Sequence, residues 1–127
     1  MPKENTMDLF GFEMPQTPSL TDEGFEEFWA VYLNHKNQIV YKSQLSKGGI
    51  TGTLVDVRVL FKMALEHFAT SVIVAHNHPT GNLKPSDADL KITKNIQQAG
   101  DLLNIKLMDH LIVGENSFFS FKDQNLL

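Results

Sequence analysis

The pattern of apolar and polar residues along the chain predicts a mixture of strands and helices. Short runs rich in β-branched and aromatic residues are typical of strands. They occupy residues 28–33, 38–46, 71–75, 105–113 and 118–121. In two longer segments, residues 54–68 and the stretch from Ser86 to Leu103, apolar residues recur three and four positions apart, which indicates amphipathic helices.

The order of these elements predicts the fold class. Strand–strand–helix–strand–helix–strand–strand is the order of an α/β fold in which helices pack on a mixed β-sheet. Turn residues at 34–37 should join the first two strands into an antiparallel hairpin. We also expect a short helical lead-in at residues 21–27, where acidic side chains lie near its start.

The beginning of the chain has a different composition. Residues 1–20 contain three prolines and no periodic apolar pattern. We therefore expect a flexible N-terminal arm at 1–20, followed by one folded domain at 21–127. Alternatively, Leu9, Phe10 and Phe12 of the arm dock on the domain or on a partner.

The overall composition narrows the range of functions. Of the 127 residues, 42% are hydrophobic, which is enough to bury a core. The formal net charge of −4 gives no electrostatic reason to expect direct nucleic-acid binding. The absence of cysteine excludes thiolate metal sites. Because no apolar stretch approaches the ~20 residues of a membrane span and no signal peptide opens the chain, we expect a cytoplasmic protein without membrane contact. Nothing in the sequence specifies an oligomeric state.

The most informative stretch joins the end of a buried strand to the start of a helix. It reads V-I-V-A-H-N-H-P-T-G-N-L-K-P-S-D-A-D from Val72 to Asp89. His76 and His78 stand two positions apart, so in an extended backbone their side chains point to the same side. Asp89 follows the expected N-cap Ser86 by three residues, which places its carboxylate in the first helical turn. Two histidines and a carboxylate are a ligand set of catalytic zinc sites, which keep a fourth position open for water.

Each part of this motif also has a simpler structural explanation. The segment from Ser86 to Asp89 matches a weak capping box, in which Asp89 only bonds back to the N-cap residue. A single histidine at a strand end is more often structural than a ligand, but the combination of histidine pair and carboxylate favours a metal site. Asp109 and His110 are either a carboxylate–imidazole pair behind the metal or a structural polar pair at a sheet edge.

The spacing of these residues resembles the JAMM motif of JAB/MPN-domain metalloenzymes. In that motif one residue separates the two histidines, seven separate the second histidine from the serine, and two separate the serine from the aspartate, as they do here. With the string D-H-L-I-V at Asp109–Val113, the chain resembles specifically the RadC branch over roughly residues 25–124. The resemblance implies a cytidine-deaminase-like α/β fold, with a mixed sheet sandwiched by helices. RadC-type proteins often carry an additional N-terminal helical domain, for which we expect no room in this chain.

The resemblance also implies roles for single residues. His76, His78 and Asp89 would bind Zn²⁺, and Ser86 would hydrogen-bond the zinc-bound water or the oxyanion that develops from the substrate carbonyl. The family has a further glutamate, on an earlier strand, that acts as the general base.

The sequence departs from the family pattern at the position of the general base. Residues 28–55 contain no Asp or Glu, and the strand expected to carry the base reads Q-I-V-Y-K-S-Q-L-S-K-G-G. The position falls on Gln44, or on Ser43 if the register differs by one residue. Neither side chain takes up a proton at neutral pH, and loss of a general base typically lowers a rate by ~10²–10⁴-fold.

Two functions follow from the resemblance. The first is a zinc-dependent metallohydrolase, in which a zinc-activated water attacks a peptide or isopeptide bond of a protein or peptide substrate. The alternative is a catalytically impaired zinc-binding JAB module, which lacks the base and acts in protein interaction. The substitution Gln44→Glu separates them, because it should raise hydrolysis only if the site is otherwise complete.

Overall fold

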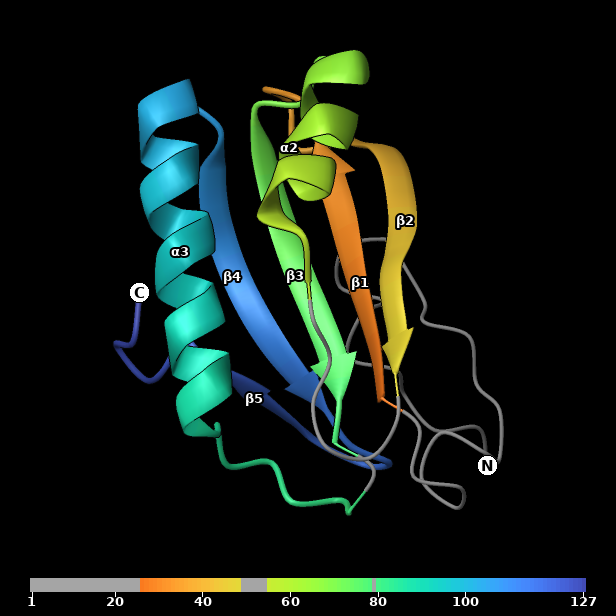
Figure 1. The fold of residues 1–127 in the computed structure, drawn as a ribbon, viewed down its shortest axis with the longest axis vertical. Helices are drawn as coiled ribbons and strands as arrows, with labels where there is room; N and C mark the ends of the chain where they lie inside the picture. The colour runs from red at the N-terminus through yellow and green to blue at the C-terminus, as the bar shows by residue number, and fades with distance from the viewer. Residues whose placement is uncertain (1–25, 49–54, 79) are drawn as a thin grey trace.

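A five-stranded sheet with two helices forms the part of the molecule described by the computed structural model, which is residues 26–48, 55–78 and 80–127 (Figure 1). The strands and helices, in chain order, are β1 Glu26–Leu33, β2 Ile39–Gly48, α2 Val57–Glu66, β3 Ser71–Asn77, α3 Asp87–Leu103, β4 Lys106–Val113 and β5 Phe118–Ser120.

The sheet is mixed, with strand order β2-β1-β3-β4-β5. Strand β1 runs antiparallel to both β2 and β3, whereas β3 and β4 are parallel and α3 connects them. The last strand, β5, returns antiparallel to β4. As a consequence, the C-terminal end of β3 and the N-terminal end of α3 lie at the same end of the molecule (Figure 1).

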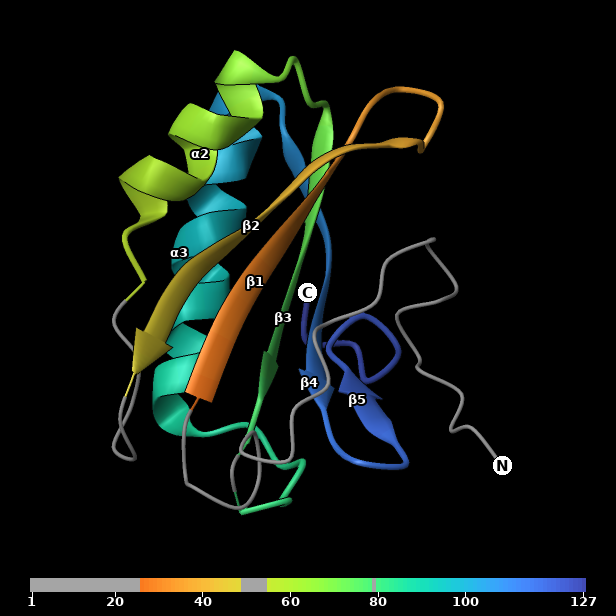
Figure 2. The same ribbon diagram turned by 90° about the vertical axis from the view of Figure 1, so that its right-hand side faces the viewer.

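Alternation along the central strands divides the apolar residues between two faces of the sheet. One face packs against both helices, and its buried cluster joins strand residues such as Phe28 and Val74 to Leu60 of α2 and Ile96 of α3. On the other face, the buried hydrophobic cluster consists of Val31, Leu33, Ile73, Ala75 and Leu111. Within the described ranges both helices therefore cover the same face, as Figure 2 shows.

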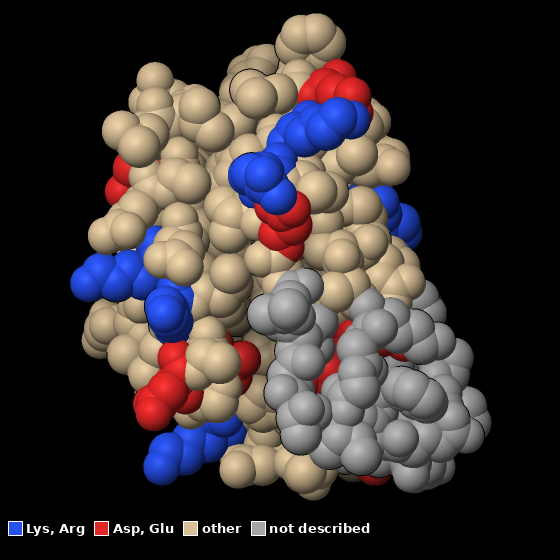
Figure 3. Space-filling view, in the orientation of Figure 1, with Lys and Arg blue, Asp and Glu red and all other residues tan. Residues whose placement is uncertain are grey.

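The charged side chains on the helix-covered face are of mixed sign (Figure 3). On α2, Arg58 forms an ion pair with Asp56 at 2.9 Å, and Lys62 forms one with Glu66 at 3.0 Å. Cations on this helix are thus neutralised by neighbouring carboxylates. No helix in the described ranges combines the length and the apolar composition needed to cross a membrane.

The structure confirms the predicted α/β class, the mixed sheet and the order of its elements. The helical lead-in expected at residues 21–27 is wrong at its end, because Glu26 and Glu27 belong to strand β1. Residues 21–25 of that prediction lie outside the described residues. Strand β3 also continues beyond Ala75 to Asn77, which brings His76 into the hydrogen-bonded sheet. The expected arm at residues 1–20, with its alternative of docking, lies outside the described residues.

Candidate metal centre

Strand β3 delivers the two histidines of the motif to the helix-covered side of the sheet. His76 lies within the strand and is only 1% exposed, and His78 follows directly after the strand end. Asn77 between them points to the opposite face, where its Oδ1 accepts the backbone N–H of Glu27 at 2.7 Å. The predicted common orientation of the two histidines is confirmed by an approach of their ring centroids to 4.9 Å.

Helix α3 delivers the carboxylate of Asp89 through its capping box. The hydroxyl of Ser86 accepts the backbone N–H of Asp89 at 3.1 Å, and Oδ2 of Asp89 accepts the backbone N–H of Ser86 at 2.8 Å. Oδ1 and Oδ2 of the same carboxylate lie 3.2 Å from Nε2 of His76 and 2.9 Å from Nε2 of His78. The capping box and the metal-site interpretation are therefore compatible, because the capping bonds hold the carboxylate in place opposite both imidazoles.

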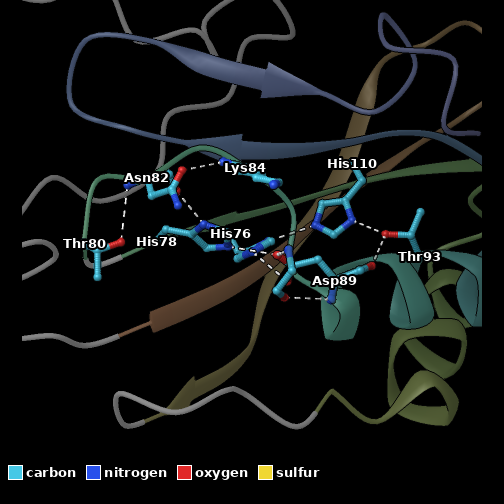
Figure 4. A network of polar contacts seen from close by, with 9 residues as sticks. His76, His78, Thr80, Asn82, Lys84, Asp89, Thr93 and His110 are labelled. Atoms are coloured by element: carbon cyan, nitrogen blue, oxygen red, sulfur yellow. Dashed lines mark hydrogen bonds and ion pairs between the residues drawn. The ribbon is translucent and has the colours of Figure 1, made fainter.

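These three side chains form a group of donor atoms that all lie within 4.8 Å of one another (Figure 4). Nδ1 of His78 lies 2.6 Å from the carbonyl oxygen of Asn82. A carbonyl oxygen can only accept, so Nδ1 of His78 carries a proton. Nε2 of His78 and Oδ2 of Asp89 form a hydrogen bond at 2.9 Å, and a bound cation would replace the proton between them. Nε2 of His76 is buried without a hydrogen-bond partner, since its 3.2 Å approach to Asp89 does not have hydrogen-bond geometry. Once the proton of His78 is displaced, the donor atoms of all three side chains converge in a way that suits a bound cation.

The electrostatics of the group reflect the same convergence. The hydrogen bond to Asp89 raises the pKa of His78, with further contributions from the carbonyl of Asn82 and the charge of Glu26. Burial alone would raise the pKa of Asp89, but the contacts from both histidines outweigh it and hold that pKa well below its ordinary value. Without a cation, the protein therefore places a proton between His78 and Asp89.

Sequence comparison connects this geometry to a family. The sequence model of the RadC-like JAB domain matches residues 4–126. This chain belongs to the RadC-like JAB domain family. It is 50% identical to a UPF0758 protein of Flavobacterium johnsoniae over 109 residues. These aligned residues make up 86% of the chain and 48% of that protein.

Other relatives show the same partial coverage. A UPF0758 protein of Porphyromonas gingivalis is 43% identical over 112 residues, which are 87% of the chain and 49% of that protein. A UPF0758 protein of Chlorobaculum parvum is 39% identical over 124 residues, which are 98% of the chain and 54% of that protein. The chain thus spans about half the length of these curated relatives. The RadC assignment made from the motif is confirmed.

Behind the candidate ligands, the JAB domain holds a second layer of buried polar groups. Nε2 of His110 lies 2.8 Å from Nδ1 of His76, and Nδ1 of His110 lies 2.5 Å from the hydroxyl of Thr93 (Figure 4). The imidazole of His110 is fully buried and stacks on Phe121 with a centroid distance of 4.4 Å, and burial lowers the pKa of His110. Phe28 stacks on His76 at 5.6 Å. The wall behind the site is therefore aromatic and closed.

Asp109 does not orient the imidazole of His110. Its Oδ1 accepts the backbone N–H groups of His110 and Lys122, at 2.7 and 3.0 Å, and its Oδ2 accepts the hydroxyl of Ser120 at 2.6 Å. Of the two alternatives for the pair, the structural one applies to Asp109, whereas His110 does lie behind the candidate metal centre.

The register of β2 decides where the two residues considered for the general base lie. Gln44 is exposed and pairs with Trp29, which packs on the face of the sheet away from the helices. Ser43 pairs with Ala30 on the helix side, and its hydroxyl contacts that of Tyr32 at 3.3 Å. Leu45 is an extra residue in β2, since Phe28 pairs with Ser46 and Trp29 with Gln44.

Two residues near the candidate metal centre, Glu26 and Thr93, were not predicted from the sequence. Glu26 begins β1 on the same side as Phe28, which pairs with His76, and its charge acts on His78. Glu26 was not considered for the site because it was expected in a helical lead-in, although the alternation Glu26, Phe28, Ala30 is typical of a strand. Thr93 follows Asp89 by four residues, and a helical face shared by these two positions was the available signal.

Proposed function

We propose that this JAB domain is a zinc-dependent hydrolase that cleaves a peptide or isopeptide bond in a protein or peptide substrate. The observation that carries the proposal is the convergence of His76, His78 and Asp89, whose donor atoms all lie within 4.8 Å of one another. Two imidazoles and one carboxylate suit Zn²⁺ and leave a coordination position for a further ligand. Membership of the JAB family supports hydrolysis over a purely structural role for such a site.

The ligands would be Nε2 of His76, Nε2 of His78 and the carboxylate of Asp89. A zinc ion bound there supplies Lewis-acid polarisation of a carbonyl group and a water of lowered pKa. His78 is half-buried and Ser86 is exposed, so a substrate can reach the site from the side of the loop that precedes α3. His76 closes the opposite side because it is buried under Phe28.

Ser86 is suited to stabilise negative charge on the substrate oxygen. Its oxygen accepts the N–H of Asp89 through a lone pair, which leaves the hydroxyl hydrogen available as a donor. A donor aimed at the oxygen of a carbonyl under attack typically accounts for ~10²–10³-fold in rate. The exposure of Ser86 supports this role, because a substrate can reach the hydroxyl group from solvent.

We assign the general base to Glu26 rather than to β2. Glu26 lies on β1 in the alternation that directs Phe28 onto His76, and the charge of its carboxylate acts on His78. A carboxylate can take a proton from an attacking water and pass it to the leaving amine, which neither Gln44 nor Ser43 can do at neutral pH.

Neighbouring residues provide a matched experiment for the base. Glu27 is buried on the opposite face, where its Oε1 accepts the indole N–H of Trp29 at 3.0 Å, a bond that glutamine would retain. Glu26→Gln and Glu27→Gln would be compared with the wild type, each loaded with one equivalent of zinc. The probes are a quenched-fluorescence peptide mixture and peptides linked through a lysine ε-amine. We expect Glu26→Gln to lower hydrolysis by about 10²–10⁴-fold and Glu27→Gln to leave it within about threefold.

Two further measurements separate the alternatives. Elemental analysis of the wild type and of His78→Ala should find about one zinc per chain only in the wild type. Zinc binding without hydrolysis of any probe would instead favour the impaired module that acts in protein interaction. Because Gln44 faces away from the ligands, we expect Gln44→Glu to leave hydrolysis unchanged, and a gain would return the base to β2.

A further inference from the structure

We propose that His110 and Thr93 are positioning residues that keep the proton of His76 on Nδ1 and thereby keep its Nε2 lone pair available to a metal. This inference rests on the metal site of the proposed function and adds the device that prepares one of its ligands. The three side chains form a continuous buried row that links His76 of β3 to His110 of β4 and to Thr93 of α3.

The direction of the hydrogen bonds is set at the Thr93 end of the row. The hydroxyl oxygen of Thr93 lies 2.6 Å from the backbone carbonyl oxygen of Asp89. Two oxygens at this separation need a hydrogen between them, and a carbonyl cannot supply it. The single hydroxyl hydrogen of Thr93 therefore points at Asp89. Towards His110 the same oxygen can only accept, so the proton of the imidazole lies on Nδ1.

The proton of His76 follows from that of His110. The imidazole of His110 is fully buried between the rings of Phe28 and Phe121. Its two nitrogens contact His76 and Thr93 rather than a carboxylate, so the ring is neutral. A neutral imidazole with its proton on Nδ1 offers a lone pair on Nε2. His76 must then donate from Nδ1 across the 2.8 Å contact, which leaves its own Nε2 without a proton.

This arrangement counters a competing form of His76. With the proton on Nε2 instead, the imidazole could donate to Oδ1 of Asp89, which lies 3.2 Å away, and a metal would have to displace that proton. Nε2 of His76 has no hydrogen-bond partner in the structure, in agreement with a lone pair there. His78 holds a proton on Nδ1 more simply, because this nitrogen donates to the backbone carbonyl of Asn82. The buried histidine instead uses His110 and Thr93 for the same purpose.

Thr93 offers a near-isosteric test with its own control. Thr93→Val removes the acceptor for His110 and keeps the shape of the side chain, whereas Thr93→Ser keeps the hydroxyl. Zinc affinity is measured by competition with a fluorescent chelator. Because loss of an outer hydrogen-bond partner typically lowers metal affinity about 10–100-fold, we expect that loss for Thr93→Val and less than about threefold for Thr93→Ser. Equal affinities of the two variants, each with native near-UV circular dichroism, would overturn the proposal.

The proton positions are read directly and without metal. Long-range ¹H–¹⁵N correlation spectra of protein labelled on histidine nitrogen, recorded above the ordinary pKa of histidine, distinguish Nδ1–H from Nε2–H rings. We expect Nδ1–H for both His76 and His110 in the wild type, and a shift of His76 towards Nε2–H in Thr93→Val. A wild-type His76 protonated on Nε2 would overturn the proposal. A wild type that binds no zinc would overturn the proposed function instead, while the spectra would still decide the proton positions.

Discussion

Asp89 combines a role in the fold with a position suited to metal binding. Asp89 completes the capping box of α3 and faces both imidazoles with the same carboxylate. Helix capping and ligation therefore require the same side-chain position. This coincidence explains why neither interpretation of the motif excludes the other.

A charge-removing substitution at Asp89 separates the two roles. An asparagine side chain would retain an oxygen that can accept the N–H of Ser86, so we expect Asp89→Asn to fold with a small loss of stability, below about 1 kcal/mol. Zinc affinity should fall by more than the roughly 10–100-fold typical of outer-shell changes, because an anionic ligand is lost. Asp87→Asn, in the same first turn, is the control and should bind zinc as the wild type does. Zinc titration followed by elemental analysis measures both, and tight binding by Asp89→Asn would contradict its role as a ligand.

The raised pKa of His78 predicts opposite effects of pH on the two forms of the protein. Contact with Asp89 stabilises the protonated imidazole in the folded state, so the stabilisation is complete below the unfolded pKa of about 6.5 and is lost as pH rises through the raised folded pKa. Zinc binding must displace this proton, so zinc affinity should increase over the same pH range. Urea denaturation with a chelator present measures the first effect, and zinc competition measures the second. If the stability of His78→Ala showed the same pH dependence as that of the wild type, the titrating group would be a residue other than His78.

At the scale of an element, α3 is positioned at both of its ends. The capping box holds its first turn against β3, and near its last turn Gly100 packs against the chain that enters β4. A Cβ atom at Gly100 would collide with the backbone carbonyl of Ile105, whose N–H bonds to the carbonyl of Gly100 at 2.9 Å. The glycine is thus required by close approach of backbone to backbone.

The substitution Gly100→Ala tests this close approach. Alanine is intrinsically better in a helix by about 1 kcal/mol, but we expect the collision to prevail and to lower the free energy of unfolding by about 1–3 kcal/mol. Gln98→Ala, at an exposed position of the same helix, should change it by less than about 0.5 kcal/mol. Chemical denaturation measures both variants. A stabilised Gly100→Ala would show that α3 and β4 can separate without cost.

At the scale of the whole molecule, the candidate ligands tie the sheet to a helix. His76 belongs to β3 in the centre of the sheet and Asp89 belongs to α3, so a bound metal would cross-link the two layers. A ligand that binds only the folded state raises the free energy of unfolding by about 2.7 kcal/mol at a concentration of about 100 times its Kd. We therefore expect zinc to raise the Tm of the wild type by several degrees, and a chelator to reverse the rise.

The same thermal scan on His78→Ala serves as the control. Without one ligand, zinc should leave its Tm nearly unchanged, although its fold keeps the sheet and both helices. An equal rise in both proteins would locate the zinc effect outside this site.

Features that depend on neighbours along one segment could be predicted from the amino-acid order alone. Strand and helix periods indicated the order of the elements, and the spacing of His76 and His78 fixed their common side, because successive residues of a strand alternate in direction. The three-residue step from Ser86 to Asp89 fixed the capping box, because helical geometry alone brings these positions together. Family membership also followed from this local spacing.

Features that depend on pairing between distant segments could not be predicted from the sequence and were determined only by the tertiary structure. The pairing of Gln44 with Trp29 turns Gln44 away from the candidate ligands, while the extension of β1 directs Glu26 towards them. The contact of Thr93 with His110 joins a helix to a strand. Residue spacing cannot give such contacts, because they arise from how strands align and how a helix packs on the sheet, and each depends on the free energy of many residues at once.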